Sequence, residues 1–459
     1  MKKKILFIFL IICNYSFSQL TIDDINTTQQ LIQDELVGNP NFPMSNLVVS
    51  TGVDFGEVNG VATFTANGAD IAFAQGIVLS TGNVLSIPGG NTSVLSEGTS
   101  NWLGDSDLEM ITGVSTSFNA SVIQFDFLAQ VESISFDFLM VSEEYGVFEC
   151  SYADTFAVIL TSLNTGVSVN LALVPNTTTP ISILNVRGGA NTSCSPENEA
   201  YFHRYNYEVT NVPANPDYIL PADSPINFNG QTEVFELTGD LVIGDNYSFK
   251  IVVADASDSS YDSALFVKKN SFGAIPIMEQ EPGDVVVEDT DNNGSSVFNL
   301  RDNETLMLGS VDTSIYTFNF NYYLTLLDAE TGVNAISNPE AYTNTEDPET
   351  IYVSMENAFT GRRITNSFRI STDSALLSTK NFELEGLEIY PNPVIDKLFI
   401  TNTKAIIKVE IYNMHGQLIV SQFSNDDADL IVDFENLANG LYFLKLESDK
   451  GTIYKRILK

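Results

Sequence analysis

The stretch YSFKIVVA at residues 247–254 decides the fold class, because apolar side chains occupy every second position. Tyr247, Phe249, Ile251 and Val253 share one face of an extended strand. The same alternation predicts strands at residues 125–128 and 134–141. Half-buried strands of this kind are typical of a β-sandwich.

Composition extends this prediction to the whole chain. The sequence has 30 Phe and 18 Tyr, frequent turn residues and no long stretch with apolar residues at helical spacing. One short helix is expected at residues 27–36, TTQQLIQDEL, where Thr precedes good helix formers. The sequence therefore predicts an all-β protein.

The length of 459 residues implies several domains, because one hydrophobic core rarely grows beyond about 250 to 300 residues. Composition changes near residue 276 and again between 374 and 386. We expect a multi-domain chain in which a large N-terminal β-sandwich precedes two small immunoglobulin-like β-sandwiches. The expected parts are a signal peptide at 1–18, the large sandwich at 19–276, a spacer domain at 280–373, a linker at 374–386 and a third domain at 387–459.

The N-terminus has the features of a secretory signal peptide. Lys2–Lys4 are basic, residues 5–12 are apolar, and Ser16 and Ser18 provide small residues before a cleavage site at Gln19. The apolar run is too short to cross a bilayer, and no later segment is apolar for long enough. The alternative interpretation of the apolar run at residues 5–12 is a buried helix at the N-terminus. Export predicts a secreted or outer-surface location.

The net charge of −38 excludes two classes of partner. Nucleic acids and anionic membrane surfaces repel such a chain. The excess of carboxylates suits solubility by self-repulsion, or binding of divalent cations.

Cys150 and Cys194 are the two cysteines that remain after signal cleavage. In an oxidising compartment an even pair predicts one disulfide. Closing a loop of about 45 residues stabilises a fold by roughly 4 kcal/mol in the chain-entropy description. Two free thiols are the alternative.

An ordered set of residues marks the last domain: Pro391, Asn392, Pro393, Asn413, Gly416, Gly440, Tyr442 and Lys455. Two prolines around one asparagine favour an extended turn, and short strands with a basic last segment follow. The set resembles the C-terminal sorting domain of the type IX secretion system of Bacteroidetes. The resemblance implies recognition by the outer-membrane translocon and removal of the domain on release or surface attachment.

The N-terminal region contains four distinctive segments: SEEYG at 142–146, CSYADTFAVIL at 150–160, LALVPNTTTPISI at 171–183 and ADASDSSYDSALFVKKNSF at 254–272. In this order they resemble the choice-of-anchor L domain, a surface-protein module. Further along, NPEAY and ETIYVSMEN resemble the immunoglobulin-like repeats of flavobacterial adhesins. One copy is present, which indicates a spacer.

Carboxylates suggest a metal site in the N-terminal domain. Asp255, Asp258 and Asp262 follow a predicted strand within eight residues, and oxygen ligands at this density suit Ca²⁺. The hypothesis joins some of them with Glu143, Glu144 or Asp154. The alternative, which is the more common role of such residues, is that they cap turns and hydrogen-bond their own backbone. Glu143 and Glu144 are expected to point to opposite faces if they lie on a strand.

Catalytic motifs are not evident in the sequence. The region before the sorting domain has one histidine, His203, and lacks HExxH, nucleophile-elbow and phosphate-loop motifs. Trp102 and the tyrosines are candidates to stack on sugars, although most aromatic residues at this abundance are expected in the core. We therefore expect a non-enzymatic adhesion protein that binds an extracellular ligand such as a polysaccharide. An extracellular glycan or peptide hydrolase and a structural matrix component remain as alternatives.

Overall fold

The computed structural model describes residues 20–289, 293–373, 387–401, 406–414, 416–423, 430–448 and 451–459. The predicted signal peptide at 1–18 and linker at 374–386 lie outside the described residues. Two compact units form: residues up to 287 together with 293–372, and residues 288–292 together with 373–459. In the described part of the chain no helix is long and apolar enough to cross a membrane.

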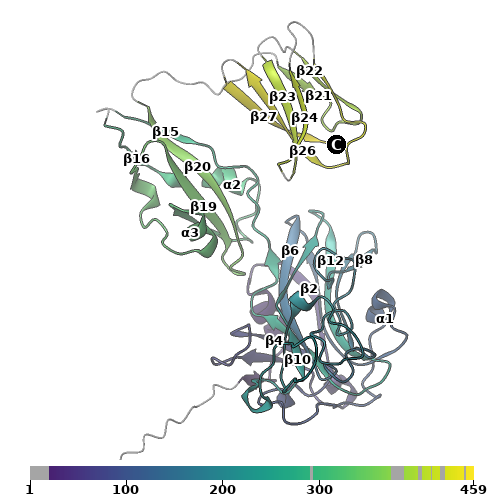
Figure 1. Ribbon diagram of the computed structural model, residues 1–459. Helices are drawn as coiled ribbons and strands as arrows, with labels where there is room; N and C mark the ends of the chain where they lie inside the picture. The colour runs from purple at the N-terminus through teal and green to yellow at the C-terminus, as the bar shows by residue number, and fades with distance from the viewer. Residues whose placement is uncertain are drawn as a thin grey trace, which may run out of the picture. The chain divides into compact units, whose positions relative to one another are not determined.

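Two packed β-sheets form the N-terminal domain (Figure 1). The nine-stranded sheet contains β1 (Thr21–Asp23), β3 (Val61–Thr65), β4 (Gln75–Ser80), β13 (Ser263–Lys268), β6 (Ser133–Ser142), β10 (Gly230–Thr232), β9 (Phe202–Tyr205), β11 (Phe235–Asp240) and β14 (Gly273–Ala274). The five-stranded sheet contains, in order, β2 (Met44–Ser50), β5 (Ser117–Leu128), β12 (Asn246–Ala256), β7 (Thr155–Ser162) and β8 (Ser168–Asn170). All of the pairs between these strands are antiparallel.

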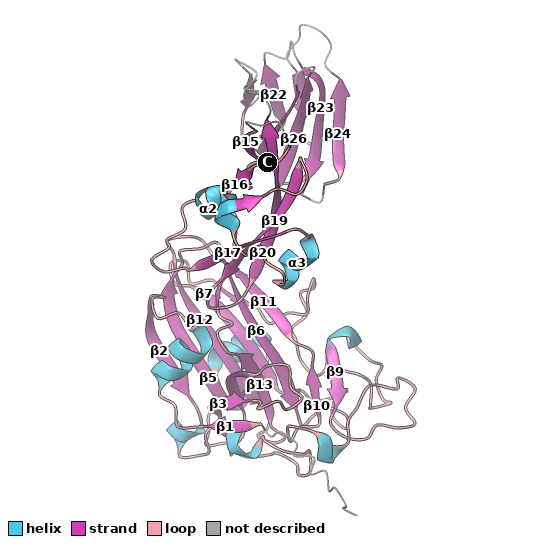
Figure 2. Ribbon diagram, turned by 90° about the vertical axis from the view of Figure 1, so that its left-hand side faces the viewer, coloured by secondary structure: helices cyan, strands magenta, loops and turns pink. Residues whose placement is uncertain are grey.

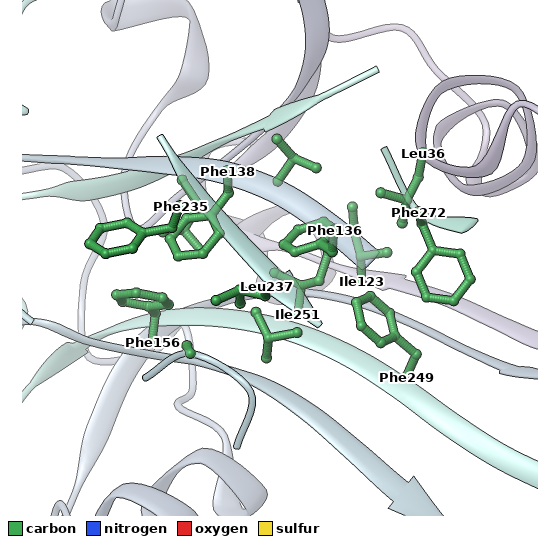
Figure 3. Close-up of a cluster of buried hydrophobic side chains, with 14 of the residues drawn as sticks. Leu36, Ile123, Phe136, Phe138, Phe156, Phe235, Leu237, Phe249, Ile251 and Phe272 are labelled. Atoms are coloured by element: carbon green, nitrogen blue, oxygen red, sulfur yellow. The ribbon is translucent and has the colours of Figure 1, made fainter. Parts of the chain in front are cut away.

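An aromatic layer fills the space between the two sheets (Figure 3). Phe136 and Phe138 project from β6 and meet Phe249 of β12 and Phe156 of β7 at ring-centre distances of 5.6 and 5.4 Å. Phe272 closes one end of the layer at 4.7 Å from Phe249. Burying each ring stabilises the fold by roughly 1.5 to 3 kcal/mol, so this layer holds the two sheets together.

The nine-stranded sheet is buried on its second face as well. Leu139, Val141 and Phe266 turn away from the aromatic layer into a second cluster with Ile226 and Phe228 from a long connection. Burial on both faces explains why the second half of β6, residues 138–141, is continuously apolar, whereas its first half alternates.

Short helices connect the strands. The predicted helix at 27–36 is a π-helix, Gln30–Val37, which buries Leu31, Ile32 and Leu36 and ends at Gly38 with a φ of 67°. An α-helix at Ser106–Thr112 (α1) was not predicted, because it is only seven residues long and depends on its Asp105 cap. Single 3-10 turns lie at Gly52–Phe55, Val84–Ser86, Glu199–Tyr201 and Pro221–Asp223.

The middle domain is built on one four-stranded antiparallel sheet. Its strands are, in order, β15 (Val285–Glu288), β20 (Arg363–Asp373), β19 (Glu349–Asn357) and β17 (Phe318–Tyr323), beside a two-stranded pair of β16 (Val297–Phe298) and β18 (Tyr342–Thr343). Helices α2 (Glu304–Leu308) and α3 (Leu326–Thr331) and 3-10 turns at Leu300–Asn303 and Pro339–Ala341 connect these strands. The described strands are thus fewer than the seven of an immunoglobulin domain.

Polar and aromatic contacts join the middle and N-terminal domains within the first unit. Arg362 forms ion pairs with the buried Asp137 and with Glu236. Asn39 donates from Nδ2 to the carbonyl oxygen of Ile315 at 2.7 Å, and Asn357 donates to that of Ala274 at 3.0 Å. These contacts attach the middle domain to the N-terminal domain in addition to the chain that connects them.

The C-terminal domain has seven described strands in two sheets, which agrees with the β-sandwich expected from its sequence. One sheet contains β21 (Glu388–Tyr390), β22 (Lys397–Thr401) and β25 (Leu430–Asp433), and the other contains β24 (Leu418–Phe423), β23 (Ile406–Asn413), β26 (Leu441–Ser448) and β27 (Gly451–Leu458). Leu398, Val409, Ile411 and Leu444 fill the core between them. Figure 2 labels β22, β23, β24 and β26 among these strands. The prediction of an all-β, multi-domain chain is confirmed.

Cys150 and Cys194 are joined by a disulfide with a Cα to Cα distance of 5.7 Å. The bond links the loop after β6 to the connection before β9. Replacing both cysteines with serine should lower the free energy of unfolding of the first unit by about 2 to 4 kcal/mol. Denaturant titration measures this change. A thiol assay on the unfolded, unreduced mature protein should find no free thiol, and two free thiols would contradict the bond.

Candidate functional site

The predicted carboxylates gather at one end of the N-terminal sandwich. Glu143 directly follows β6 and Asp262 directly precedes β13, and these strands pair in the nine-stranded sheet through Ser142 and Ser263. Asp154 directly precedes β7 and Asp255 lies near the end of β12, two strands that pair in the five-stranded sheet. The connection from β12 to β13 crosses between the sheets, which brings the four carboxylates to the same end.

Glu143 and Glu144 are both buried and lie beyond the last residue of β6. The strand alternation that would separate them therefore does not apply, and they contribute to the same cluster. Glu143 accepts a hydrogen bond from the backbone N–H of Leu95 at 3.0 Å, and Glu144 accepts one from the N–H of Asp154 at 2.6 Å.

The aspartates of the cluster differ in exposure. Asp154, Asp255 and Asp262 are at most 3% exposed, whereas Asp258 is exposed. Asp262 accepts a hydrogen bond from the N–H of Glu97 at 2.9 Å. Asp258 accepts one from the N–H of Ser260 at 2.9 Å, which is the local turn contact that the alternative interpretation expected for it.

Burial without a positively charged partner changes the pKa values of the cluster's carboxyl groups. None of the described lysine, arginine or histidine side chains forms an ion pair with the six carboxylates. Burial raises the pKa of Glu143, of Glu144 and of Asp262 to about 7. It also raises the pKa values of Asp154 and Asp255 well above 3.8, and each of these charges repels the other.

The six carboxylates do not yet form a metal centre. The described residues contain no three His, Cys, Asp or Glu side chains arranged as the ligand set of a metal ion. The calcium site therefore stays a prediction.

A groove of about 620 Å³ lies on the five-stranded sheet, on the face away from the aromatic layer. Its floor is formed by alternate residues of neighbouring strands, Gln124 of β5, Ser248 and Lys250 of β12, and Thr161 of β7. Helix α1 lies beside β8 (Figure 1) and also contacts β7. Its residue Met110 borders the groove. The sequence contained a signal for this surface, because Ser248 and Lys250 alternate with the apolar face of β12.

Trp102 is a core residue, as the alternative to sugar stacking expected, and cannot stack on a sugar. The indole is completely buried, and its Nε1 donates to the carbonyl oxygen of Ala120 at 2.8 Å. His203 is partly exposed and pairs through Nδ1 with Glu233 at 2.7 Å beside a pocket of about 160 Å³.

The residues of the predicted sorting motif have structural roles in the C-terminal domain. Asn392, between Pro391 and Pro393, donates to the carbonyl oxygen of Arg456 at 2.9 Å and accepts from the N–H of Leu458 at 2.8 Å. The turn is thereby attached to the last strand.

Most of the other motif residues lie at turns of the C-terminal domain. Asn413 accepts from the N–H of Gln417 at 3.0 Å, and Gly416 has a φ of 72° that favours glycine. Gly440 exchanges two backbone hydrogen bonds with Lys459, and the buried Tyr442 donates to the carbonyl oxygen of Ala438 at 2.7 Å. Lys455 is exposed on β27.

The raised pKa values predict an unusual pH dependence in buffer free of divalent cations. Between pH 4.5 and about 7 the folded protein keeps protons on Glu143 and its neighbours, whereas the unfolded chain loses them near pH 4.5. The free energy of unfolding of the first unit should therefore fall as the pH rises through this range, by on the order of 2 kcal/mol for Glu143 alone. Denaturant titrations at pH 5 and pH 7 measure the change. The Glu143→Gln variant should reduce it, and greater stability at pH 7 than at pH 5 would contradict the prediction.

Three family models match the chain in order. They are the Choice-of-anchor L domain at residues 21–273, the Flavobacterium inter-domain disulphide bond domain at 284–376 and the Secretion system C-terminal sorting domain at 388–459. Residues 284–376 contain no cysteine, so in this chain the second domain forms no disulfide. The first and third matches confirm the resemblances found in the sequence.

Similarity to individual proteins is weaker. The chain is 26% identical over 103 residues to ulvan lyase NLR42 of Nonlabens ulvanivorans. The match covers 21% of this chain and only 19% of the length of the lyase. Among solved structures, the adhesin domain of Epf from Streptococcus pyogenes matches at 8% identity and a TM-score of 0.19, over 56% of this chain and 74% of that one. Latent PorU from Porphyromonas gingivalis matches at 11% identity and a TM-score of 0.14. The match covers 74% of this chain and 31% of that chain. These TM-scores are too low to establish a shared fold.

The C-terminal match has a consequence for location. A sorting domain of the type IX secretion system makes this a secreted or cell-surface protein and implies an interaction with that system. The N-terminal model covers more than half of the chain. The protein therefore belongs to the choice-of-anchor L domain family.

Proposed function

We propose that the protein is a non-catalytic adhesion protein whose N-terminal domain binds a neutral polysaccharide. The observation that supports this is the groove of about 620 Å³ on the outer face of the five-stranded sheet. A groove bordered by a rigid sheet accepts an extended chain at little cost in conformational entropy.

The chemistry of the groove suits hydroxyl-rich ligands. Gln124 donates to Ser248 at 3.1 Å, and the hydroxyl oxygens of Thr161 and Ser168 are 2.8 Å apart. Amide and hydroxyl groups both donate and accept hydrogen bonds, as sugar hydroxyls do. Met110 and Leu163 add exposed apolar surface against which the sugar ring faces can pack.

The charges around the groove favour a neutral ligand over an anionic one. Lys250 is already neutralised by ion pairs with Asp105 and Asp107, the latter at 2.8 Å. The chain as a whole carries a net charge of −38, which repels anionic polysaccharides at a distance. In this proposal the middle domain acts as a spacer, and the sorting domain delivers the protein to the outside.

A glycan hydrolase is the second candidate, supported by the pair of His203 and Glu233 beside its pocket. General acid and base catalysis needs two such groups within reach of a substrate. A structural matrix component, the third candidate, needs neither groove nor pocket.

Glycan-array and calorimetric measurements on the mature chain test the adhesion proposal. Thr161→Arg fills the groove with a long charged side chain and should weaken binding of neutral glycans at least about tenfold. Thr238→Arg, on an exposed position of β11 in the other sheet, is the matched control and should leave affinity unchanged. Equal binding by both variants, absence of glycan binding, or release of reducing ends that His203→Ala abolishes would contradict the proposal.

Export gives a second prediction. Deletion of residues 387–459 should retain the protein in the periplasm, because the translocon then has no domain to recognise. Asn392→Ala, which removes two hydrogen bonds, should destabilise the C-terminal domain by about 1 to 2 kcal/mol and reduce the exported fraction. Cell fractionation with immunoblotting measures both effects, and normal delivery of the truncated protein would contradict the role of the domain.

A further inference from the structure

Several buried carboxylate oxygens at the end of the N-terminal sandwich have no hydrogen-bond partner among the described residues. They are Oδ2 of Asp262 and, by hydrogen-bond geometry, both oxygens of Asp255 and Oδ2 of Asp154. The hydroxyl groups of Thr81 and Ser263 are the groups that interact with Asp255 and Asp154. Asp255, Asp154 and Asp262 are 0%, 3% and 1% exposed. Leaving such atoms unpaired costs free energy, so native proteins rarely do so without a ligand, a proton or an ion.

The neighbouring Glu149 shows what a satisfied buried carboxylate looks like in the same domain. It is completely buried, but accepts hydrogen bonds from the Tyr205 hydroxyl at 2.6 Å and from the N–H groups of Asn191 and Gly146 at 2.8 and 3.0 Å. The unpaired oxygens of the cluster are therefore a property of this site and not of buried acids in general.

Three members of the cluster share one arrangement. Asp262 and Glu144 each use one oxygen to accept from a backbone N–H, and Asp154 uses Oδ1 in the same way at 3.4 Å from Ala256. A backbone contact on one oxygen orients a carboxylate and leaves the other oxygen available to a cation, which is how the surroundings of metal sites hold their ligands.

Asp255 lies at the centre of the cluster. Its charge interacts with those of Asp154, Glu144, Asp258 and Asp262. Asp258 is exposed, so the cluster extends from the surface to the interior of the domain.

The carboxylate of Asp262 occupies the space that a side chain at Gly82 would need. A Cβ atom at this position would lie 1.8 Å from Oδ2 of Asp262. Any residue other than glycine would therefore displace the Asp262 carboxylate.

We infer that Asp154, Asp255 and Asp262, with Glu144, bind one Ca²⁺ ion where the ends of β6, β7, β12 and β13 meet. Ca²⁺ accepts six to eight oxygen ligands in flexible geometry, whereas Mg²⁺ requires a near-ideal octahedron. The oxygens are not arranged around one point in advance, so binding moves side chains, and a tolerant ion is favoured. The ion compensates the charges and links the two sheets at this end.

Calorimetry on the metal-stripped mature chain at pH 7 tests this inference. One saturable Ca²⁺ site is expected, with a Kd between about 0.01 and 1 mM, and a hundredfold excess over Kd should raise the Tm of the first unit by about 5 °C. Mg²⁺ at the same concentration should give a smaller shift.

Asp255→Asn is the decisive variant. It should lose the saturable site and the Tm shift, while its Tm without calcium stays at or above that of the wild type because one repelling charge is removed. Asp240→Asn, the same substitution at an exposed position of β11, should keep both. If Asp255→Asn does not fold, Gly82→Ala should weaken binding at least about tenfold.

Three results would overturn the inference. They are no binding heat and no Tm shift up to about 10 mM Ca²⁺, equal responses to Ca²⁺ and Mg²⁺, or unchanged binding by Asp255→Asn. Weak binding of many ions to the acidic surface is distinguished from the site because it does not saturate at one ion and is insensitive to Asp255.

Discussion

The aromatic layer between the two sheets is the constraint on which the N-terminal domain depends. Phe136, Phe138, Phe156 and Phe249 must face one another for either sheet to bury its apolar side. This packing fixes which strand ends meet, because β12 and β13 are consecutive but belong to opposite sheets. The acidic cluster exists because the chain crosses between sheets at the point where β6 ends and β7 begins.

The same packing creates two polar surfaces with different properties. At the end of the sandwich, carboxylates are enclosed without a positive partner, which raises their pKa values and favours a proton or a cation. On the outer face of the five-stranded sheet, hydroxyl and amide groups are displayed in a groove whose one lysine is already paired. In our proposals the first surface stabilises the domain and the second binds a ligand.

Different interactions stabilise the two units of the chain. The first unit uses the Cys150–Cys194 disulfide inside the N-terminal domain and the ion pairs of Arg362 towards the middle domain. The C-terminal domain uses Asn392 to attach its first turn to its last strand. Residues that characterise the sorting domain are thus also residues that its fold requires.

The sequence by itself determined the all-β class, the order of the domains, the sorting domain and the pairing of two cysteines, because these follow from local alternation, composition and ordered motifs. It also identified the acidic residues of the cluster. It did not determine that Glu143 and Glu144 lie beyond a strand end, that Trp102 is buried, or that a groove crosses four strands. Those features arise from contacts between residues far apart in the chain, so only the tertiary structure decided which carboxylates are buried together and which polar side chains share a surface.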